Sequence, residues 1–333
     1  MAPTKQRAAY VTENGITFGI VDVPKPGPGE ILVKVEAAAQ NPSDWKAAGR
    51  ALKAENYGVI VGNDFAGTVV ELGPGIPDGL RTVGERVAGY VRGSLGVNGA
   101  FSEYLVADAE FGILAIPEGW SFEQGAQLAI GPLTALQCGA AKPGGGATGH
   151  GRDILIWGGS TATGQYAIQF AKLNGLRVLT TASPKNLEFV KNLGADVVFD
   201  YRDENVVQKI RAATGNALEI AIDTVSEGKT PEQVTGSIGD KGGNVAILLP
   251  YESPRPDVKV TFRYVPKFLD RDSNGKWFFD LHKKIFASGK IKPNPVAIQP
   301  KGLASVREGL QFMQDGKVSA QKITYRISDT PAI

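Results

Sequence analysis

The sequence predicts an α/β protein that combines a doubly wound parallel sheet with a separate β-rich domain. Two patterns indicate this fold class: β-rich runs separated by Gly and Pro fill the first third of the chain, and apolar strands alternate with amphipathic helices from about residue 153 onward. Apolar strands joined by helices are typical of a parallel sheet covered on both faces. The length of 333 residues is enough for roughly two domains of about 150 residues each.

The β-rich part extends from about residue 8 to residue 122. Its short runs, with turn residues between them, predict a mostly antiparallel sheet. Ser121 is placed to cap a helix over residues 123–137, although no acidic partner stands in the ideal position for a capping box. A Gly-rich stretch at 140–153, which contains His150, predicts a surface loop. The predicted strands are 31–39, 65–73, 85–91 and 100–107.

The parallel unit follows the Gly-rich stretch. Each predicted strand leads into a helical pattern, which is the arrangement of consecutive right-handed βαβ units. The strands are predicted at 153–159, 177–183, 196–201, 218–225 and 243–249, the last of which closes the series. From about residue 267 the pattern is mixed, with helices predicted near 277–288 and 303–315 and a final strand at 321–327.

Composition excludes several kinds of site and partner. One Cys and two His leave little for a three-ligand Cys/His zinc site and exclude a four-cysteine zinc site. The 36 Lys and Arg nearly balance the 34 Asp and Glu, so we expect neither nucleic acid nor a membrane as a partner. No window holds the about 18 apolar residues of a membrane helix, and we expect a cytoplasmic protein. The alternative, a secreted protein without its leader, fits poorly with a single Cys.

A Gly-rich loop joins the first parallel strand to its helix, which is the setting of a dinucleotide-binding fingerprint. The loop supplies Gly159 and Gly164 but has Thr161 where the middle Gly of the fingerprint stands. Hydroxyl groups can donate hydrogen bonds to phosphate, so we expect the segment 160–163 to bind a pyrophosphate with its side chains. The alternative is a tight strand-to-helix turn with no ligand.

The end of the second parallel strand predicts which nicotinamide cofactor binds. NAD enzymes place Asp or Glu there, about 20 residues after the loop, to bind the ribose 2′-hydroxyl. This chain has no carboxylate at that point and instead has Ser183 and Lys185, a donor and a cation suited to a 2′-phosphate. NADPH is therefore favoured. The alternative for Lys185 is a solvated lysine, although a cation is disfavoured at a helix N-terminus.

At this point the residues resemble the medium-chain dehydrogenase/reductase superfamily along essentially the whole chain. The resemblance implies a Rossmann NADPH-binding domain at 124–268 and a β-rich, GroES-like catalytic domain formed by 1–123 and 269–333. Zinc-dependent members carry a Cys near the position of Gln40 and a His-Glu pair after a Gly near position 62. This chain has Asn63 and Asp64 there, so the resemblance is to the zinc-free quinone, enal and enoyl reductases, with no metal.

The chain is also similar to the fungal trans-acting enoyl reductases that partner polyketide synthases in secondary metabolism. The motifs that carry this likeness are NPSDWK (41–46), GNDFAGTVVELG (62–73), GAFSEY (99–104), GGSTATG (158–164), ASPKN (182–186), VFDYR (198–202) and SAQKI (319–323). The resemblance implies an oxidoreductase that uses NADPH to reduce a carbon–carbon double bond next to a carbonyl. It also implies a small-molecule or carrier-bound enoyl substrate, and it makes a polyketide synthase a candidate partner.

Family roles carried over by position give the candidate site residues. Thr134 is similar to the Thr near the nicotinamide, and Lys46 to a lysine of the active-site cleft that also contacts the cofactor. The cofactor-binding set implied in this way is Lys46, Gly159, Ser160, Thr161, Ala162, Thr163, Gly164, Ser183, Lys185, Asn186, Tyr201, Leu248, Leu249 and Lys322.

Without a metal, hydride transfer depends on positioning and on donors that polarise the carbonyl. Lys46 and Asn41 are the candidate donors, with Thr134 as a further candidate catalytic residue. Asp44 is expected to be structural or a partner of Lys46, and Asn63 and Asp64 are expected to be hydrogen-bonded filler. Two other readings stay open: a quinone or enal reductase of detoxification, and an NADPH-binding module without turnover.

The predicted oligomeric state is a monomer. The segment before the candidate edge strand of the parallel sheet contains Pro250, Pro254 and Pro256, and charged residues follow. Proline and charge on an edge disfavour pairing with a second sheet.

Overall fold

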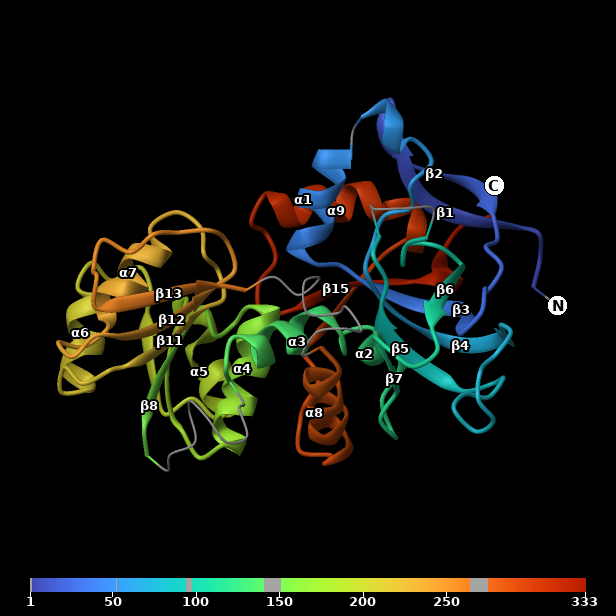
Figure 1. The fold of residues 1–333 in the computed structure, drawn as a ribbon. Coiled ribbons are helices and arrows are strands. Elements are labelled where there is room, and N and C mark those ends of the chain that lie inside the picture. Colours follow the sequence, from blue (N-terminus) through green and yellow to red (C-terminus); the bar gives the residue numbers. More distant parts are fainter. Residues whose placement is uncertain (1, 52, 94–97, 141–150, 264–274) are drawn as a thin grey trace. The chain divides into compact units, whose positions relative to one another are not determined.

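The computed structural model describes residues 2–51, 53–93, 98–140, 151–263 and 275–333. The chain forms two compact units: unit 1 consists of residues 1–130 and 269–333, and unit 2 of residues 131–268. The predicted Gly-rich loop falls mostly on 141–150, and with His150 it lies outside the described residues. Figure 1 shows the elements of both units along the chain.

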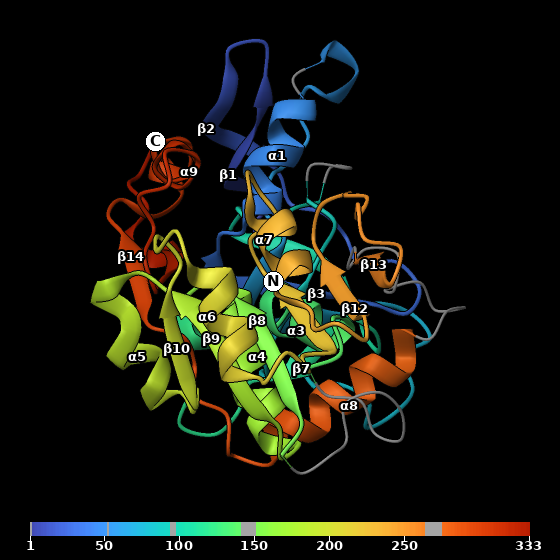
Figure 2. The ribbon, with the colours of Figure 1, turned by 90° about the vertical axis from the view of Figure 1, so that its left-hand side faces the viewer.

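Unit 2 is the predicted Rossmann fold. In its described residues the sheet has six parallel strands in the order β10-β9-β8-β11-β12-β13. The chain places β9 and β10 on one side of β8 and then returns to place β11, β12 and β13 on the other side. In Figure 2 the strands β8, β9 and β10 can be followed with the helices α4, α5 and α6 that alternate with them. The strands are β8 (Asp153–Trp157), β9 (Arg177–Ala182), β10 (Val197–Asp200), β11 (Ile220–Asp223), β12 (Gly243–Ile247) and β13 (Val258–Phe262); the helices are α4 (Ala162–Leu173), α5 (Leu187–Asn192), α6 (Val206–Ala213) and α7 (Thr230–Ser237).

Burial of the strands from both sides explains their continuous apolar sequences. Alternate residues of β8 belong to opposite faces: Leu155 and Trp157 pack with α6 and α7 residues such as Ile210 and Val234, and Ile154 and Ile156 are equally buried. Strand β13 was not part of the predicted series, which ended at 249. It extends the sheet by pairing with β12 along five residues.

Unit 1 contains the predicted β-rich sheet. The strand order is β14-β15-β3-β4-β5-β7, and β6 pairs with β3. All of these pairs are antiparallel except β14 with β15. The strands are β3 (Glu30–Ala39), β4 (Asp64–Leu72), β5 (Arg86–Tyr90), β6 (Tyr104–Asp108), β7 (Ile113–Ala115), β14 (Val296–Gln299) and β15 (Lys322–Arg326).

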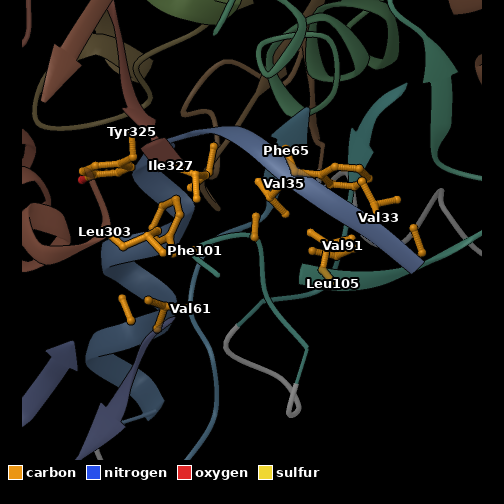
Figure 3. Close-up of a cluster of buried hydrophobic side chains, with 14 of the residues drawn as sticks. Val33, Val35, Val61, Phe65, Val91, Phe101, Leu105, Leu303, Tyr325 and Ile327 are labelled. Atoms are coloured by element: carbon orange, nitrogen blue, oxygen red, sulfur yellow. The ribbon is translucent and has the colours of Figure 1, made fainter. Parts of the chain in front are cut away.

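The core of unit 1 joins segments from both ends of the chain. Phe101 and Tyr325 meet edge to face, with ring centroids 5.1 Å apart. Figure 3 shows these two rings with Val35, Phe65 and Leu303 in the same buried cluster. The last strand of the sequence therefore completes the sheet that the first hundred residues begin. Unit 1 also contains α1 (Pro42–Ala51), α8 (Gly275–Ala287), η4 (Gly302–Ser305) and α9 (Val306–Gln314).

The prediction of one continuous helix over 123–137 is wrong. Two helices form instead, α2 (Phe122–Gly125) and α3 (Ile130–Gln137). Pro132 lacks the N–H that would continue the ladder to Leu128, and the Ile130 N–H donates to the side chain of Asp64 at 3.2 Å. The start of α2 also differs from the expectation, because Ser121 forms a complete capping box with Gln124 rather than with an acid.

One hairpin of unit 1 was missed. Strands β1 (Lys5–Thr12) and β2 (Gly15–Asp22) form a two-stranded antiparallel sheet with Thr12 opposite Gly15. Gly15 has φ 95°, a left-handed conformation that favours glycine. Asn14-Gly15 between two apolar runs is a turn signal that could have predicted this hairpin. Within the described residues no helix has the length and apolar character needed to cross a membrane.

Candidate functional site

The Gly-rich loop of unit 2 follows directly after β8, the strand that lies between β9 and β11 in the sheet. This is the switch point of the strand order, where ligands bind in open parallel sheets. A Cβ added at Gly159 would lie 2.2 Å from the Thr180 hydroxyl, and one at Gly164 would lie 2.3 Å from the Gly158 carbonyl oxygen. The two fingerprint glycines are therefore required by close packing of the loop against β9 and against itself.

Thr161, in place of the middle Gly, is the N-cap of α4. Its hydroxyl oxygen accepts the Gly164 N–H at 2.9 Å and lies 2.9 Å from the Thr224 hydroxyl. The Thr224 hydroxyl also lies 2.7 Å from the Trp157 carbonyl oxygen and 3.0 Å from that of Gly158. The structure directs the Thr161 hydroxyl to these protein groups, and its predicted hydrogen bond to phosphate stays a prediction.

The hydroxyl groups of Ser160 and Thr163 can bind a ligand. Both residues are partly buried, and within the described ranges neither hydroxyl makes a hydrogen bond. They flank Thr161 and Ala162 at the start of a 12-residue helix, where backbone N–H groups and the helix dipole favour an anion. This part of the loop can hold a pyrophosphate.

A second group of candidate residues follows β9 and β10. These parallel strands end side by side, since Asp200 is in register with Ala182. Ser183 is buried, whereas Lys185 and Tyr201 are exposed, and the Asn186 N–H donates to the Ser183 carbonyl at 2.8 Å. Two predicted segments that are distant in sequence thus meet at one edge of the sheet.

Arg202 was missed as a candidate. It follows Tyr201 directly, and its guanidinium lies 5.5 Å from the centre of the Tyr201 ring. With Lys185 it places two exposed cations after neighbouring strands. Its position at the end of the VFDYR motif was the signal that could have identified it.

Leu248 and Leu249 follow β12, and the Leu248 N–H donates to the Ser226 hydroxyl at 2.8 Å. Ser226 has φ 57°, and Asp223 holds this turn by accepting the N–H groups of Val225 and Ser226 at 2.9 and 2.8 Å. The cofactor contacts of both leucines stay predictions.

Thr134 lies in α3 and is 6% exposed. Its carbonyl oxygen accepts the Cys138 N–H at 3.0 Å. Its predicted place near the nicotinamide is not tested by these contacts and stays a prediction.

Unit 1 contains a buried polar network around Asn63 and Asp64, the two residues that stand where zinc-dependent members of the superfamily were expected to carry zinc ligands. Asn41 donates from its side chain to Asp64 at 2.9 Å, and the Lys322 ammonium donates to Asn41 and lies 3.4 Å from the same carboxylate. Asp44 accepts the Asn41 backbone N–H at 2.6 Å and a hydrogen bond from the Asn63 side chain. The network therefore ties the start of α1 to β4 and β15.

The ionisable groups of the network, which belong to Asp44, Asp64 and Lys322, are all buried. Burial raises the pKa of the Asp44 carboxyl to about 7; the nearby Asp64 adds to the rise, and the Asn41 N–H opposes it. Burial also raises the pKa of Asp64, against the attraction of Lys322. Neighbouring groups thus tune both carboxyls, as happens at functional sites and in structural ion-pair networks alike.

Several of the predicted site residues lie in this network. Asp44 has the structural role that was one of its two alternatives, and Asn63 and Asp64 are hydrogen-bonded as expected. Lys322 is 2% exposed and its ammonium lies in the network; its predicted contact with the cofactor stays a prediction. The side chain of Asn41 bonds to Asp64 and Lys322, and its predicted role as a donor to the substrate stays a prediction.

Lys46 lies one turn further along α1. Its ammonium is 5.3 Å from the centre of the Trp45 ring, and the residue is partly buried. Because α1 begins at the network, the position of Lys46 depends on the bonds of Asn41 and Asp44. The donor role of Lys46 stays a prediction.

Cys138 and His282 are both buried in environments that disfavour their charged forms. Burial raises the pKa of Cys138 to about 12, which disfavours the nucleophilic thiolate. His282 packs against Phe286 with ring centroids 4.8 Å apart, and burial lowers its pKa to about 3. In the part of the chain that the structure describes, no three His, Cys, Asp or Glu side chains are grouped to hold a metal.

Comparisons with known proteins cover both units. An alcohol dehydrogenase GroES-like domain model matches residues 27–118, and a zinc-binding dehydrogenase model matches residues 162–261. The chain is 35% identical to a trans-enoyl reductase from Alternaria alternata over 96% of this chain and 99% of the relative. It is 34% identical to one from Penicillium citrinum over 97% and 98%. A quinone oxidoreductase structure from Coxiella burnetii has a similar fold, with a TM-score of 0.78, 23% identity, and coverage of 97% and 99%.

Proposed function

Because the chain belongs to the quinone and enoyl reductase branch of the medium-chain dehydrogenase/reductase superfamily, we propose that it reduces an α,β-unsaturated carbonyl compound or thioester with NADPH, without a metal. The observation that carries this proposal is the near full-length similarity to proteins named trans-enoyl reductases. A carrier-bound enoyl thioester, supplied by a polyketide synthase, is the substrate class that this similarity favours. We further propose a monomer that acts in the cytoplasm.

The residues of unit 2 fit a dinucleotide phosphate. Gly159 and Gly164 leave no room for a Cβ, so the loop backbone is held close to the helix N-terminus. Ser160 and Thr163 would donate to the pyrophosphate, and Ser183 with Lys185 would bind the 2′-phosphate. Arg202, beside Tyr201, adds a second cation for that phosphate.

When bound, NADPH supplies the hydride that the β-carbon of the substrate accepts. The task of the chain is to bind and orient both reactants and to stabilise the negative charge that develops on the substrate carbonyl oxygen. We assign this donor role to Lys46, whose helix is held by the buried network. We assign Asn41 and Lys322 to holding that helix, because their polar atoms already bond within the network.

A substrate panel tests the proposed function. Purified protein is mixed with NADPH and crotonyl or longer enoyl thioesters, enals or quinones, with and without a chelator, and NADPH oxidation is followed. Oxidation with the thioesters that survives the chelator is the expected result. Oxidation with quinones alone would instead indicate a detoxifying reductase, and binding of NADPH with no turnover would contradict both enzyme functions.

Lys185→Ala is expected to raise the Kd for NADPH about 10- to 100-fold, which is the contribution of a hydrogen bond to a charged group. The Kd for NADH should stay within about twofold, because NADH lacks the 2′-phosphate. Fluorescence titration of both cofactors measures the difference. Lys229→Ala, a change at another exposed lysine of unit 2, is the control, and equal losses for NADPH and NADH would remove Lys185 from the 2′-phosphate site.

Lys46→Ala is expected to lower kcat about 100-fold, the usual cost of removing one donor to a developing oxyanion. Steady-state kinetics with an enoyl thioester, together with the Kd for NADPH, separate the two roles predicted for this residue. A lower kcat with an unchanged Kd supports substrate polarisation, whereas a higher Kd with an unchanged kcat would assign Lys46 to the cofactor. Lys53→Ala, at an exposed lysine of unit 1, is expected to change neither.

A further inference from the structure

The loop after β8 is held by Thr181, in β9, and by Thr224, the residue after β11, and neither threonine belongs to the fingerprint motif. We propose that Thr224 is a positioning residue for the pyrophosphate of the cofactor, with Thr181 as its counterpart on the other side of the loop. This inference rests on the proposed binding of NADPH by unit 2. It concerns which residues hold the loop in its binding form.

The hydroxyl hydrogens of Thr161 and Thr224 can be assigned from their neighbours. Two carbonyl oxygens, of Trp157 and Gly158, lie 2.7 and 3.0 Å from the Thr224 hydroxyl. A carbonyl can only accept, so Thr224 donates to them and its oxygen is free to accept from Thr161. Thr161 in turn accepts the Gly164 N–H. A continuous chain of hydrogen bonds therefore links the end of β8, the residue after β11 and the first turn of α4.

Thr181 holds the opposite side of the loop. Its hydroxyl accepts the Gly158 N–H and its carbonyl oxygen accepts the Gly159 N–H, both at 2.9 Å. Thr181 is fully buried and Thr224 is 7% exposed, so water competes little for these bonds. The N–H groups of Gly158 and Gly159 face β9 and are not available to a ligand.

This arrangement explains how Thr161 can stand where the fingerprint has its middle Gly. The usual Gly lets the backbone approach the pyrophosphate closely. Here the Thr161 side chain turns inward to Thr224 and Gly164, and the hydroxyls of Ser160 and Thr163 remain as donors on either side. A loop that is already held in this form does not have to be ordered when the cofactor binds, which favours affinity.

Thr224→Val tests the proposal, because it keeps the shape and burial of the side chain and removes only the hydroxyl. We expect the Kd for NADPH to rise about tenfold, since the Thr161 hydroxyl loses its acceptor, the Trp157 and Gly158 carbonyl oxygens lose their donor, and the loop is no longer held in its binding form. The Kd for 2′-AMP, which carries the 2′-phosphate but no pyrophosphate, should not change. Thr224→Ser keeps the hydroxyl and should restore NADPH binding to near the original value.

Thr214→Val is the matched control. Thr214 is also 7% exposed and also donates its hydroxyl to backbone carbonyls of unit 2, at Ile210 and Arg211. Both valine variants should lower the melting temperature by a similar amount, but only Thr224→Val should weaken NADPH. An unchanged Kd in Thr224→Val, or an equal rise in Thr214→Val, would overturn the positioning role. Failure of the unaltered protein to bind NADPH would instead overturn the proposed function.

Discussion

Lys322→Met is expected to lower the free energy of unfolding by about 3–5 kcal/mol, the usual cost of removing one partner of a buried ion pair. The ammonium of Lys322 is 2% exposed and Asp64 is fully buried. Without the ammonium, the donors left to Asp64 among the described residues are Asn41 and Ile130, and Asp44 keeps its raised pKa beside a second carboxylate. Chemical denaturation of the unaltered protein and of the variant measures the difference.

The loss should depend on pH with a definite sign. The pKa of Asp64 in the folded protein is already raised, and removing Lys322 raises it further. A carboxyl with a raised folded pKa contributes stability at low pH and loses it as the pH rises through that pKa. The deficit of Lys322→Met should therefore be larger at about pH 8 than at about pH 5.

Two further variants make the interpretation specific. Lys34→Met removes a lysine from the same unit whose pair with Glu36 is partly exposed, and it should cost less than about 1 kcal/mol. Adding Asp64→Asn to Lys322→Met should restore part of the lost stability, because it removes the unpaired charge. A double variant that is no more stable than Lys322→Met, or a deficit independent of pH, would contradict the ion pair as the source of the effect.

The sequence was sufficient for the elements whose patterns are local. The apolar runs of β3 and β8 follow directly from the burial of consecutive residues, and so of both faces of each strand. Gly159 and Gly164 were identified from the fingerprint spacing alone, and the close contacts around both are now visible. The local pattern gave the wrong result where a contact with a distant residue ends a helix. The Ile130 N–H bonds to Asp64, and the predicted long helix is interrupted there.

The polar residues were harder to place, because their partners are distant in sequence. Lys322 was assigned to the cofactor by its position in the family motif, and nothing in the sequence indicated that it pairs with a carboxylate 258 residues away. Thr224 gave no signal at all, since it is 63 residues from the Thr161 hydroxyl it meets. The same hydropathy pattern in a sequence is compatible with an exposed or a buried hydroxyl or ammonium group. A buried group needs hydrogen-bond partners, and the sequence does not show which distant residues supply them.

Gly164→Ala is expected to raise the Kd for NADPH about 100-fold, although the same substitution within most helices stabilises by up to about 1 kcal/mol. The added Cβ would lie 2.3 Å from the Gly158 carbonyl oxygen and 2.9 Å from the Gly159 Cα. Both neighbours are backbone atoms, so no side chain can rotate away to make room. The loop and the helix must separate, and the Gly164 N–H then loses its bond to Thr161.

Gly236→Ala gives a matched control for Gly164→Ala in the same unit. Gly236 lies in α7, and the nearest atom to an added Cβ is a Val207 methyl carbon at 3.6 Å, an ordinary contact. This variant should be neutral or slightly stabilising and should bind NADPH normally. Calorimetric titration with NADPH and thermal unfolding of both variants provide the comparison. If Gly164→Ala bound NADPH as tightly as Gly236→Ala, the loop would not be the pyrophosphate site, because a phosphate held by this backbone cannot tolerate a displacement of that size.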